Sequence, residues 1–138
     1  LFLPDRVHAD AEGWSIMNQF RGVLSREGQI NFTHQRPGAV KAWHRHEHRT
    51  DFLLCLHGHA RVGVYREEDE QLWSMVIGAM RPGVMIVPPH LWHGLATVGD
   101  EPAGLLYYMS HAYDPAAPDI ERRPCDAMPG FAWRGDLL

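Results

Sequence analysis

The sequence is poor in cysteine and has no long apolar run. Only Cys55 and Cys125 occur, outside any CxxC pair, so neither a disulfide framework nor a thiolate metal site is expected. No run approaches the roughly 18 apolar residues of a membrane-spanning helix, so no membrane partner is expected. The first residues lack a basic segment followed by an apolar stretch, which argues against a secretory signal. These absences favour a reducing, cytoplasmic location.

An excess of positive charge is also missing. Seventeen acidic and 13 basic residues give a formal net charge of −4, and the arginines are scattered along the chain. Nucleic-acid binding proteins gather their basic residues into a patch or stripe, so no nucleic-acid partner is expected. An anionic small molecule stays compatible with this balance. The apolar fraction of 45% and the 138 residues predict one globular domain over residues 1–138.

Short segments with apolar residues follow one another, separated by turn residues, and no alternation of strands with helices is visible. Such spacing predicts an all-β sandwich or small barrel. The expected strands run from 29 to the turn at 36–38, and over 40–46, 52–56, 60–66, 72–77, 84–87, 91–98 and 105–110. We therefore divide the domain into an N-terminal arm (1–27), a barrel core (28–113) and a proline-rich tail (114–138).

The two ends of the chain carry different signals. The apolar residues of the arm, from Trp14 to Leu24, fit either a short helix or an edge strand. Four prolines between 115 and 129 exclude a long helix or a central strand from the tail. We expect the tail to lie across the barrel or a partner subunit, with Phe131 and Trp133 as anchors.

Histidine is abundant: ten occur, eight of them between residues 34 and 93. His44 and His46 are two positions apart, so on a strand both point to one face, which in a barrel is the interior. With Asp51 and the distant His93 they form a set of nitrogen and oxygen ligands suited to Fe(II), Mn(II), Ni(II) or Zn(II). In the alternative, the histidines are hydrogen-bonded polar residues of the barrel wall and Asp51 lies at the surface.

The spacing His-x-His, four residues, a carboxylate, six residues and Gly, followed later by Gly, Pro and His, resembles the two-part cupin pattern. The runs VKAWHRHEHRTDFLLCLHGHARVGVY and VMIVPPHLWHGLATVGDEPAGLLYYMSHAYDP, with IERRPCD and GFAW, resemble the dTDP-4-dehydrorhamnose 3,5-epimerase family over roughly residues 36–133. The first half is also similar to nucleotide-sugar 3,4-ketoisomerases. The resemblance implies a cupin jelly roll and an epimerase or ketoisomerase of a nucleotide-linked 4-keto-6-deoxy sugar. It also implies a homodimer, with the tail or an N-terminal strand crossing between subunits, and no organic cofactor.

Site roles follow from the same resemblance, position by position. His44 stands at the place of the histidine base and Tyr107 at that of the tyrosine acid, whereas Asp51 occupies a position where the family usually has lysine. The expected substrate-binding residues are Lys41, His46, His90, His93 and Tyr113.

Two further classes of function compete with this interpretation. A metal-dependent cupin, such as a dioxygenase or an isomerase of another small molecule, would use His44, His46, Asp51 and His93 as ligands. A metal-bound imidazole is not a free base, so the two models compete for His44. The expected cofactor is therefore either none or one divalent transition metal (Fe, Mn, Ni or Zn). The third class is a non-catalytic sugar-binding cupin.

Overall fold

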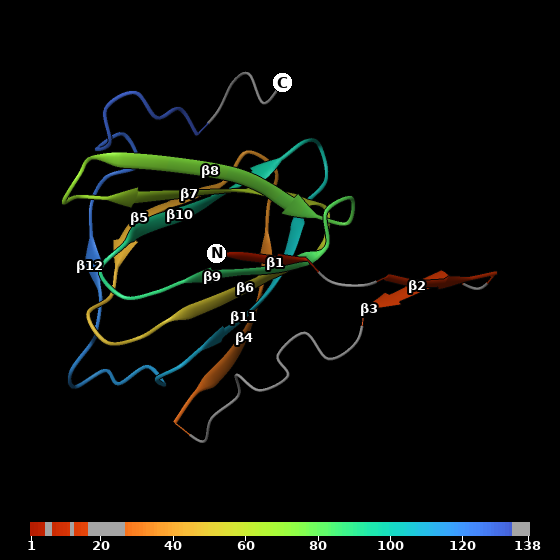
Figure 1. The fold of residues 1–138 in the computed structure, drawn as a ribbon, viewed down its shortest axis with the longest axis horizontal. Coiled ribbons are helices and arrows are strands. Elements are labelled where there is room, and N and C mark those ends of the chain that lie inside the picture. The colour runs from red at the N-terminus through yellow and green to blue at the C-terminus, as the bar shows by residue number, and fades with distance from the viewer. Residues whose placement is uncertain (5–6, 12, 17–26, 134–138) are drawn as a thin grey trace.

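The computed structural model describes residues 1–4, 7–11, 13–16 and 27–133, which form two facing five-stranded sheets and a separate hairpin (Figure 1). The first sheet has the order β1 (Phe2–Pro4), β9 (Gly83–Val87), β6 (Asp51–His57), β11 (Ala103–Met109), β4 (Gln29–Gln35). The second has the order β12 (Glu121–Arg122), β5 (Val40–Arg45), β10 (Trp92–Val98), β7 (His59–Arg66), β8 (Gln71–Gly78). The hairpin of β2 (Val7–Asp10) and β3 (Gly13–Ile16) projects away from both sheets (Figure 1).

This architecture confirms the expected all-β cupin jelly roll. All the strand pairings are antiparallel, and the eight strands expected between residues 29 and 110 are present within a few residues of their predicted bounds. In the arm, Trp14 and Ile16 lie in a strand, whereas the expectation for residues 17–26 lies outside the described residues. No helix in the described part of the chain has the length and apolar character needed to cross a membrane.

Apolar side chains from both sheets fill the space between them at one end of the sandwich. The cluster is buried and comprises Leu53, Cys55, Ala60, Val62, Ile77, Met85, Val87, Ala103 and Leu105. These residues alternate with outward-facing ones along their strands, as the period of two predicts. The hydrophobic core therefore stabilises one end of the sandwich and leaves room for a cavity beside it.

The tail packs against the outer face of the second sheet. Phe131 and Trp133 place their ring centroids 5.1 and 4.8 Å from that of Trp43, so both contribute to the expected anchoring. Gly63 makes this contact possible, because a Cβ there would lie 2.6 Å from the Phe131 ring and 2.7 Å from the Trp133 ring. Further upstream, β12 pairs with β5 and brings Arg122 opposite His44.

The edge strand β4 presents its polar side chains to the interior. Gln29, Asn31, Thr33 and Gln35 line the cavity between the sheets. Ile30 and Phe32 point the other way, and 52% and 63% of their surface is exposed. Because side chains alternate along a strand, the residues that face the cavity determine which residues face outward. The strand thus gives the cavity a polar wall at the cost of two exposed apolar side chains.

Candidate functional site

A cavity of about 750 Å³ lies between the two sheets and continues under the tail. It is open to solvent and is lined by residues of β4, β5, β6, β10 and β11, of segment 111–113 and of the tail up to Arg123. Six of the residues expected at the site lie on its wall: Lys41, His44, Asp51, His93, Tyr107 and Tyr113. Residues from five strands, segment 111–113 and the tail therefore meet in one space.

His44 and Tyr107 approach this cavity from different sheets. His44 is on β5 of the second sheet, and Tyr107 is on β11 of the first sheet, opposite Asn31 of β4. The two sheets face each other across the cavity, so the imidazole and the phenol lie on different walls. A molecule bound between them would present one face to each group.

Three histidines and one carboxylate form a compact cluster that joins the two sheets, because His44 and His93 belong to the second sheet and Asp51 begins β6 of the first. His44, His46, Asp51 and His93 each contribute one potential ligand atom, and these four atoms lie within 4.8 Å of one another. The His44 ring centroid is 4.2 Å from that of His93 and 5.5 Å from that of His46. Asp51 is 2% exposed, so the alternative that placed it at the surface is wrong.

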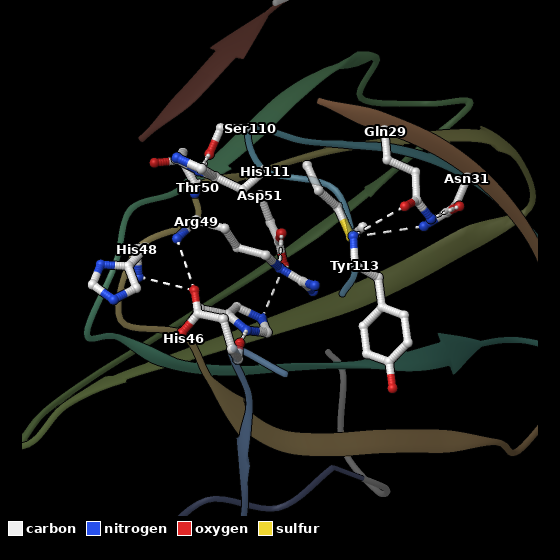
Figure 2. Close-up of polar contacts among 12 residues, drawn as sticks. Gln29, Asn31, His46, His48, Arg49, Thr50, Asp51, Ser110, His111 and Tyr113 are labelled. Atoms are coloured by element: carbon white, nitrogen blue, oxygen red, sulfur yellow. Dashed lines mark hydrogen bonds and ion pairs between the residues drawn. The ribbon is translucent and has the colours of Figure 1, made fainter. Parts of the chain in front are cut away.

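Arg49 contributes the positive charge nearest to Asp51, and the two side chains lie close together in Figure 2. Its Nε donates to Oδ1 at 2.9 Å and its guanidinium NH₂ group to Oδ2 at 3.4 Å. Burial raises the pKa of Asp51. The contacts with His46 and His93 and the charge of Arg49 lower it by more, so the pKa lies well below its usual range. Asp51 is therefore an ionised carboxylate inside the fold.

Hydrogen bonds determine which ring nitrogens of two histidines carry a proton. Nδ1 of His46 is 2.6 Å from the Asp119 carbonyl oxygen, and Nδ1 of His93 is 2.9 Å from the Leu91 carbonyl oxygen. A carbonyl oxygen only accepts, so both Nδ1 atoms must donate. In neutral rings both Nε2 atoms then carry lone pairs, and they lie 3.4 and 3.1 Å from Asp51 Oδ2.

With both rings neutral, this arrangement points three electron-rich atoms at one another, whereas a proton on either Nε2 would turn its contact into a hydrogen bond that keeps Asp51 ionised. The buried Nε2 of His46 has no hydrogen-bond partner, which is costly for a polar atom away from water. A bound cation, or an additional proton on a ring, would relieve the repulsion between these lone pairs and the carboxylate. The backbone carbonyl that holds Nδ1 is also the usual second contact of a metal-binding histidine. The cluster therefore fits a divalent transition metal by donor type and orientation.

The third histidine is held in its neutral form. Burial of the His44 ring, reinforced by the nearby rings of His93 and His46, lowers the pKa of His44 well below its usual value of 6.5. At neutral pH the ring has a free lone pair, which can accept a proton or bind a metal. The geometry is consistent with either role.

Two expected substrate-binding residues are not on the cavity wall. His46 is 3% exposed and lies behind the wall, within the cluster. His90 is exposed and lines a separate depression with Arg45, Arg66 and the Pro88–Pro89 pair. Its backbone has a positive φ of 72°, and its N–H donates to the His46 carbonyl at 2.7 Å. The structure thus brings His46 to the cluster and leaves His90 outside the cavity.

The cavity also contains residues that the motifs did not indicate. Arg122 and Arg123 of the tail are among its lining residues, together with Arg49 and Lys41. Arg49 is paired with Asp51, and Arg123 with Glu67. The polar residues of β4 form another part of the wall; Figure 2 shows Gln29 and Asn31 near Tyr113. Their alternation with Ile30 and Phe32 was visible in the sequence, but alternation alone does not tell which face is interior.

Comparisons with known proteins place this geometry among sugar-modifying relatives. The family model described as the polysaccharide biosynthesis C-terminal domain matches residues 8–120. The chain is similar to the probable low-salt glycan biosynthesis epimerase Agl13 of Haloferax volcanii, with 40% identity over 96 residues. That match covers 65% of this chain and 62% of the relative, so the chain matches less than two thirds of that protein. It is also 29% identical to the spore coat polysaccharide biosynthesis protein SpsL of Bacillus subtilis, over 94% of this chain and 91% of the relative.

A solved structure extends the similarity over nearly the whole chain. The dTDP sugar isomerase from Desulfovibrio desulfuricans superimposes with a TM-score of 0.84 and 27% identity, covering 99% of this chain and 91% of that one. These matches confirm the resemblance to nucleotide-sugar epimerases and isomerases that the motifs indicated.

Proposed function

Because this chain belongs to the family of polysaccharide biosynthesis C-terminal domains, we propose that it is an epimerase or ketoisomerase of a nucleotide-linked 4-keto-6-deoxy sugar. The relatives named as epimerases and as a dTDP sugar isomerase support this class of activity. The observation that carries the proposal is the placement of His44 and Tyr107 on different walls of one cavity. This is what a reaction needs when a proton leaves one face of a carbon and another proton reaches the opposite face.

The reaction begins at a carbon next to the keto group. Neutral His44 accepts the proton from that carbon, and the electron pair of the C–H bond moves into the enolate. Tyr107 then gives its phenolic proton to the other face of the same carbon, which inverts it and regenerates the ketone. Lys41, on the same strand as His44, is the cation available to the enolate oxygen. For a ketoisomerase, the enediol formed in the same way would be reprotonated at the neighbouring carbon.

The surroundings of the cavity support a diphosphate-containing substrate. Lys41 and Arg122 contribute positive charge to the wall, and arginine binds phosphate oxygens in a bidentate manner. Tyr113, which is 56% exposed on the cavity wall, offers an aromatic face to a sugar or a base. A sugar carrying a nucleoside diphosphate uses both kinds of contact.

The proposal is tested by hydrogen exchange into the substrate. The protein is incubated in D₂O with a dTDP-4-keto-6-deoxyhexose, and deuterium next to the keto carbon is followed by NMR. We expect exchange with the wild type and a loss of about 10²- to 10⁴-fold in His44→Asn, as for removal of a general base. Tyr107→Phe should lose epimerisation while retaining slow exchange at one face, and Tyr65→Phe, on β7 away from the cavity, serves as the control.

The outcomes separate the proposal from its rivals. Full exchange in His44→Asn would contradict a base at this position. Tight binding of the nucleotide sugar without any exchange in the wild type would instead support a non-catalytic sugar-binding protein.

A metal-dependent reaction is the second candidate, and the converging lone pairs of His46 and His93 favour it. His44, His46, Asp51 and His93 would hold one divalent ion of Fe, Mn, Ni or Zn. Such an ion supplies Lewis acidity, which polarises a keto oxygen and stabilises an enolate. Arg49 would keep Asp51 ionised and oriented in either case. In this model His44 is a ligand, and proton transfer falls to other residues of the cavity.

Elemental analysis of untagged protein, purified without chelator, tests the metal. About one transition metal ion per chain, lost in His46→Gln, would support the ligand set. His59→Gln is the control, because this histidine lies outside the cluster. A wild-type protein that exchanges substrate hydrogen at full rate after chelation and without bound metal would contradict this candidate.

We further propose that the protein acts as a homodimer in the cytoplasm. The exposed apolar side chains of Ile30 and Phe32 on the edge strand β4 support a second copy as the partner of that face. Free cysteines at 55 and 125 are compatible with a reducing compartment.

A further inference from the structure

One carboxylate of the tail binds the backbone of the loop between β5 and β6. Asp119 Oδ1 accepts from the N–H of Glu47 at 2.7 Å, and Oδ2 accepts from those of His48 and Arg49 at 2.9 and 3.1 Å. Successive backbone N–H groups that converge on an anion form a nest, a favourable anion site in proteins. The loop that carries His46 and Arg49 is thus attached to a residue about 70 positions later in the chain.

The same residue also holds a side chain of the cluster. Its carbonyl oxygen accepts the proton of His46 Nδ1 at 2.6 Å, which directs Nε2 of that ring toward Asp51. Its carboxylate holds the backbone of Arg49, whose guanidinium binds Asp51. Two of the groups around Asp51 are therefore oriented from one point.

The tail has its own attachments next to Asp119. Trp43 and Arg123 exchange two backbone hydrogen bonds of 2.9 Å, and Arg45 binds the Glu121 carboxylate at 3.0 Å. Glu67 bridges Arg45 and Arg123 at 3.1 and 2.8 Å. The position of Asp119 is therefore set independently of the loop that it binds.

We propose that Asp119 is a positioning residue of this site, which fixes the Nδ1–H form of His46 and the direction of Arg49 so that both face Asp51. The proposed positioning of His46 and Arg49 rests on these contacts alone, whereas an effect of Asp119 on turnover rests on the proposed function. Asp119 lines the cavity, but its polar atoms are engaged with the loop, so its action on the reaction is through His46 and Arg49.

The structural part is tested without substrate. Imidazole ¹⁵N spectra at about pH 8 distinguish Nδ1–H from Nε2–H rings, and comparison with His46→Gln assigns the His46 signals. We expect the wild type to show Nδ1–H at His46. Asp119→Ala keeps the backbone carbonyl but releases the loop that carries His46, so the ring should move away from that carbonyl and show a mixture of both forms. Backbone N–H groups of residues 47–49 should also exchange with solvent faster. The exposed Asp126 lies in the same tail outside the cavity, so Asp126→Ala is the matched control and should leave both signals unchanged.

Asp119→Asn provides a second variant of nearly the same size. One amide oxygen remains for a loop N–H, but the amide NH₂ group cannot accept from the other two donors, so a smaller effect in the same direction is expected. Unchanged His46 signals and loop exchange in both folded variants would overturn the proposal. Loss of folding in both would overturn it as well, because Asp119 would then be a residue that the whole fold needs.

Kinetics then test the catalytic consequence. Changes around a site residue's supporting contacts typically cost about 10- to 100-fold, and we expect that loss in kcat with little change in KM for Asp119→Ala. Disturbed His46 signals together with an inactive wild type would leave the positioning intact and contradict the proposed function. Disturbed signals with an unchanged kcat would overturn the catalytic consequence of the positioning.

Discussion

At the residue scale, the least expected side chain is a buried aspartate at the position where the resemblance to the 3,5-epimerases implies a lysine. Asp51 lies charged inside the fold, where Arg49 pairs with it and the Nε2 atoms of His46 and His93 approach its Oδ2. A lysine at this place would have met the guanidinium of Arg49. The surrounding residues therefore suit an aspartate at this position.

Replacing Asp51 by Asn should destabilise the protein. The variant keeps the volume but leaves the Arg49 guanidinium without its anion in a largely buried place, and breaking a buried pair costs about 3–5 kcal/mol. Urea unfolding of metal-free protein measures this loss, with Asp126→Asn as the exposed control. A difference below about 1 kcal/mol would fit a surface pair and contradict the buried network.

At the scale of elements, the distance between β5 and β10 determines the distance between His44 and His93. The two residues are partners in the register of this strand pair, and the pairing shifts at Gly94. Gly94 has no room for a side chain: a Cβ there would lie 2.8 Å from both the Ala42 Cα and the Lys41 carbonyl oxygen. The absence of a Cβ lets the strands approach closely beside the cluster.

Substituting Gly94 by Ala should therefore separate these strands. We expect a loss of stability of about 1–3 kcal/mol, as for overpacking, and a marked fall in kcat because His44 and His93 move apart. Thermal unfolding and the deuterium exchange assay measure the two effects. Gly104→Ala is the milder comparison, since the nearest atom to the added Cβ would be the Cβ of His57 at 3.2 Å. Equal effects of the two variants would contradict a special role for the β5–β10 approach.

The tail is held to the second sheet by ion pairs that depend on pH. The hydrogen bond from Arg123 and the charges of Arg123 and Arg45 lower the pKa of Glu67 below its usual value of 4.5. A carboxyl whose pKa is lower in the folded state stabilises the fold above the unfolded value, and this contribution is lost as pH falls through the folded value.

Glu67→Gln should thus be less stable than the wild type near pH 7, and the difference should shrink between about pH 5 and pH 3. Denaturant unfolding across this pH range measures it. The exposed Glu70 is the control position, and Glu70→Gln should show a smaller pH-dependent difference. A difference for Glu67→Gln that is independent of pH would mean that its ion pairs do not stabilise the tail.

At the scale of the whole molecule, the inverted polarity of β4 connects the cavity with the outer surface. Its polar residues face the cavity, so its apolar residues must face outward, where Ile30 and Phe32 lie exposed. An edge strand with exposed apolar residues favours association. The proposed dimer would cover them.

Phe32→Asp should therefore weaken the dimer. Sedimentation of the wild type should give about twice the chain mass of 15.7 kDa, and the variant should shift toward that single mass at micromolar concentrations. Met80→Asp changes another exposed apolar residue, far along the sequence in the turn after β8, and should leave the mass unchanged. A wild-type monomer would contradict the dimer, and a dimer that persists in Phe32→Asp would place the interface elsewhere.

The sequence by itself determined the strands and the chemical types at the site. Period-two segments between glycine and proline turns are local signals, and so they predicted eight strands close to their observed bounds. The pair His44 and His46 and the distant His93 could be associated because strand geometry and the family motifs relate them. The anchoring role of Phe131 and Trp133 was expected because they are aromatic residues in a tail whose prolines exclude a long helix or a central strand.

Only the tertiary structure decided which residues meet across the sheets and from the tail. The burial of Asp51, its pairing with Arg49 and the placement of His90 outside the cavity depend on loop paths that no local pattern specifies. Asp119 is about 70 residues from the loop that it binds, and its backbone carbonyl acts there as much as its side chain. Such contacts arise from the packing of distant segments, because hydrogen bonding to a backbone group requires no particular side chain on the partner and so leaves no signature in the sequence.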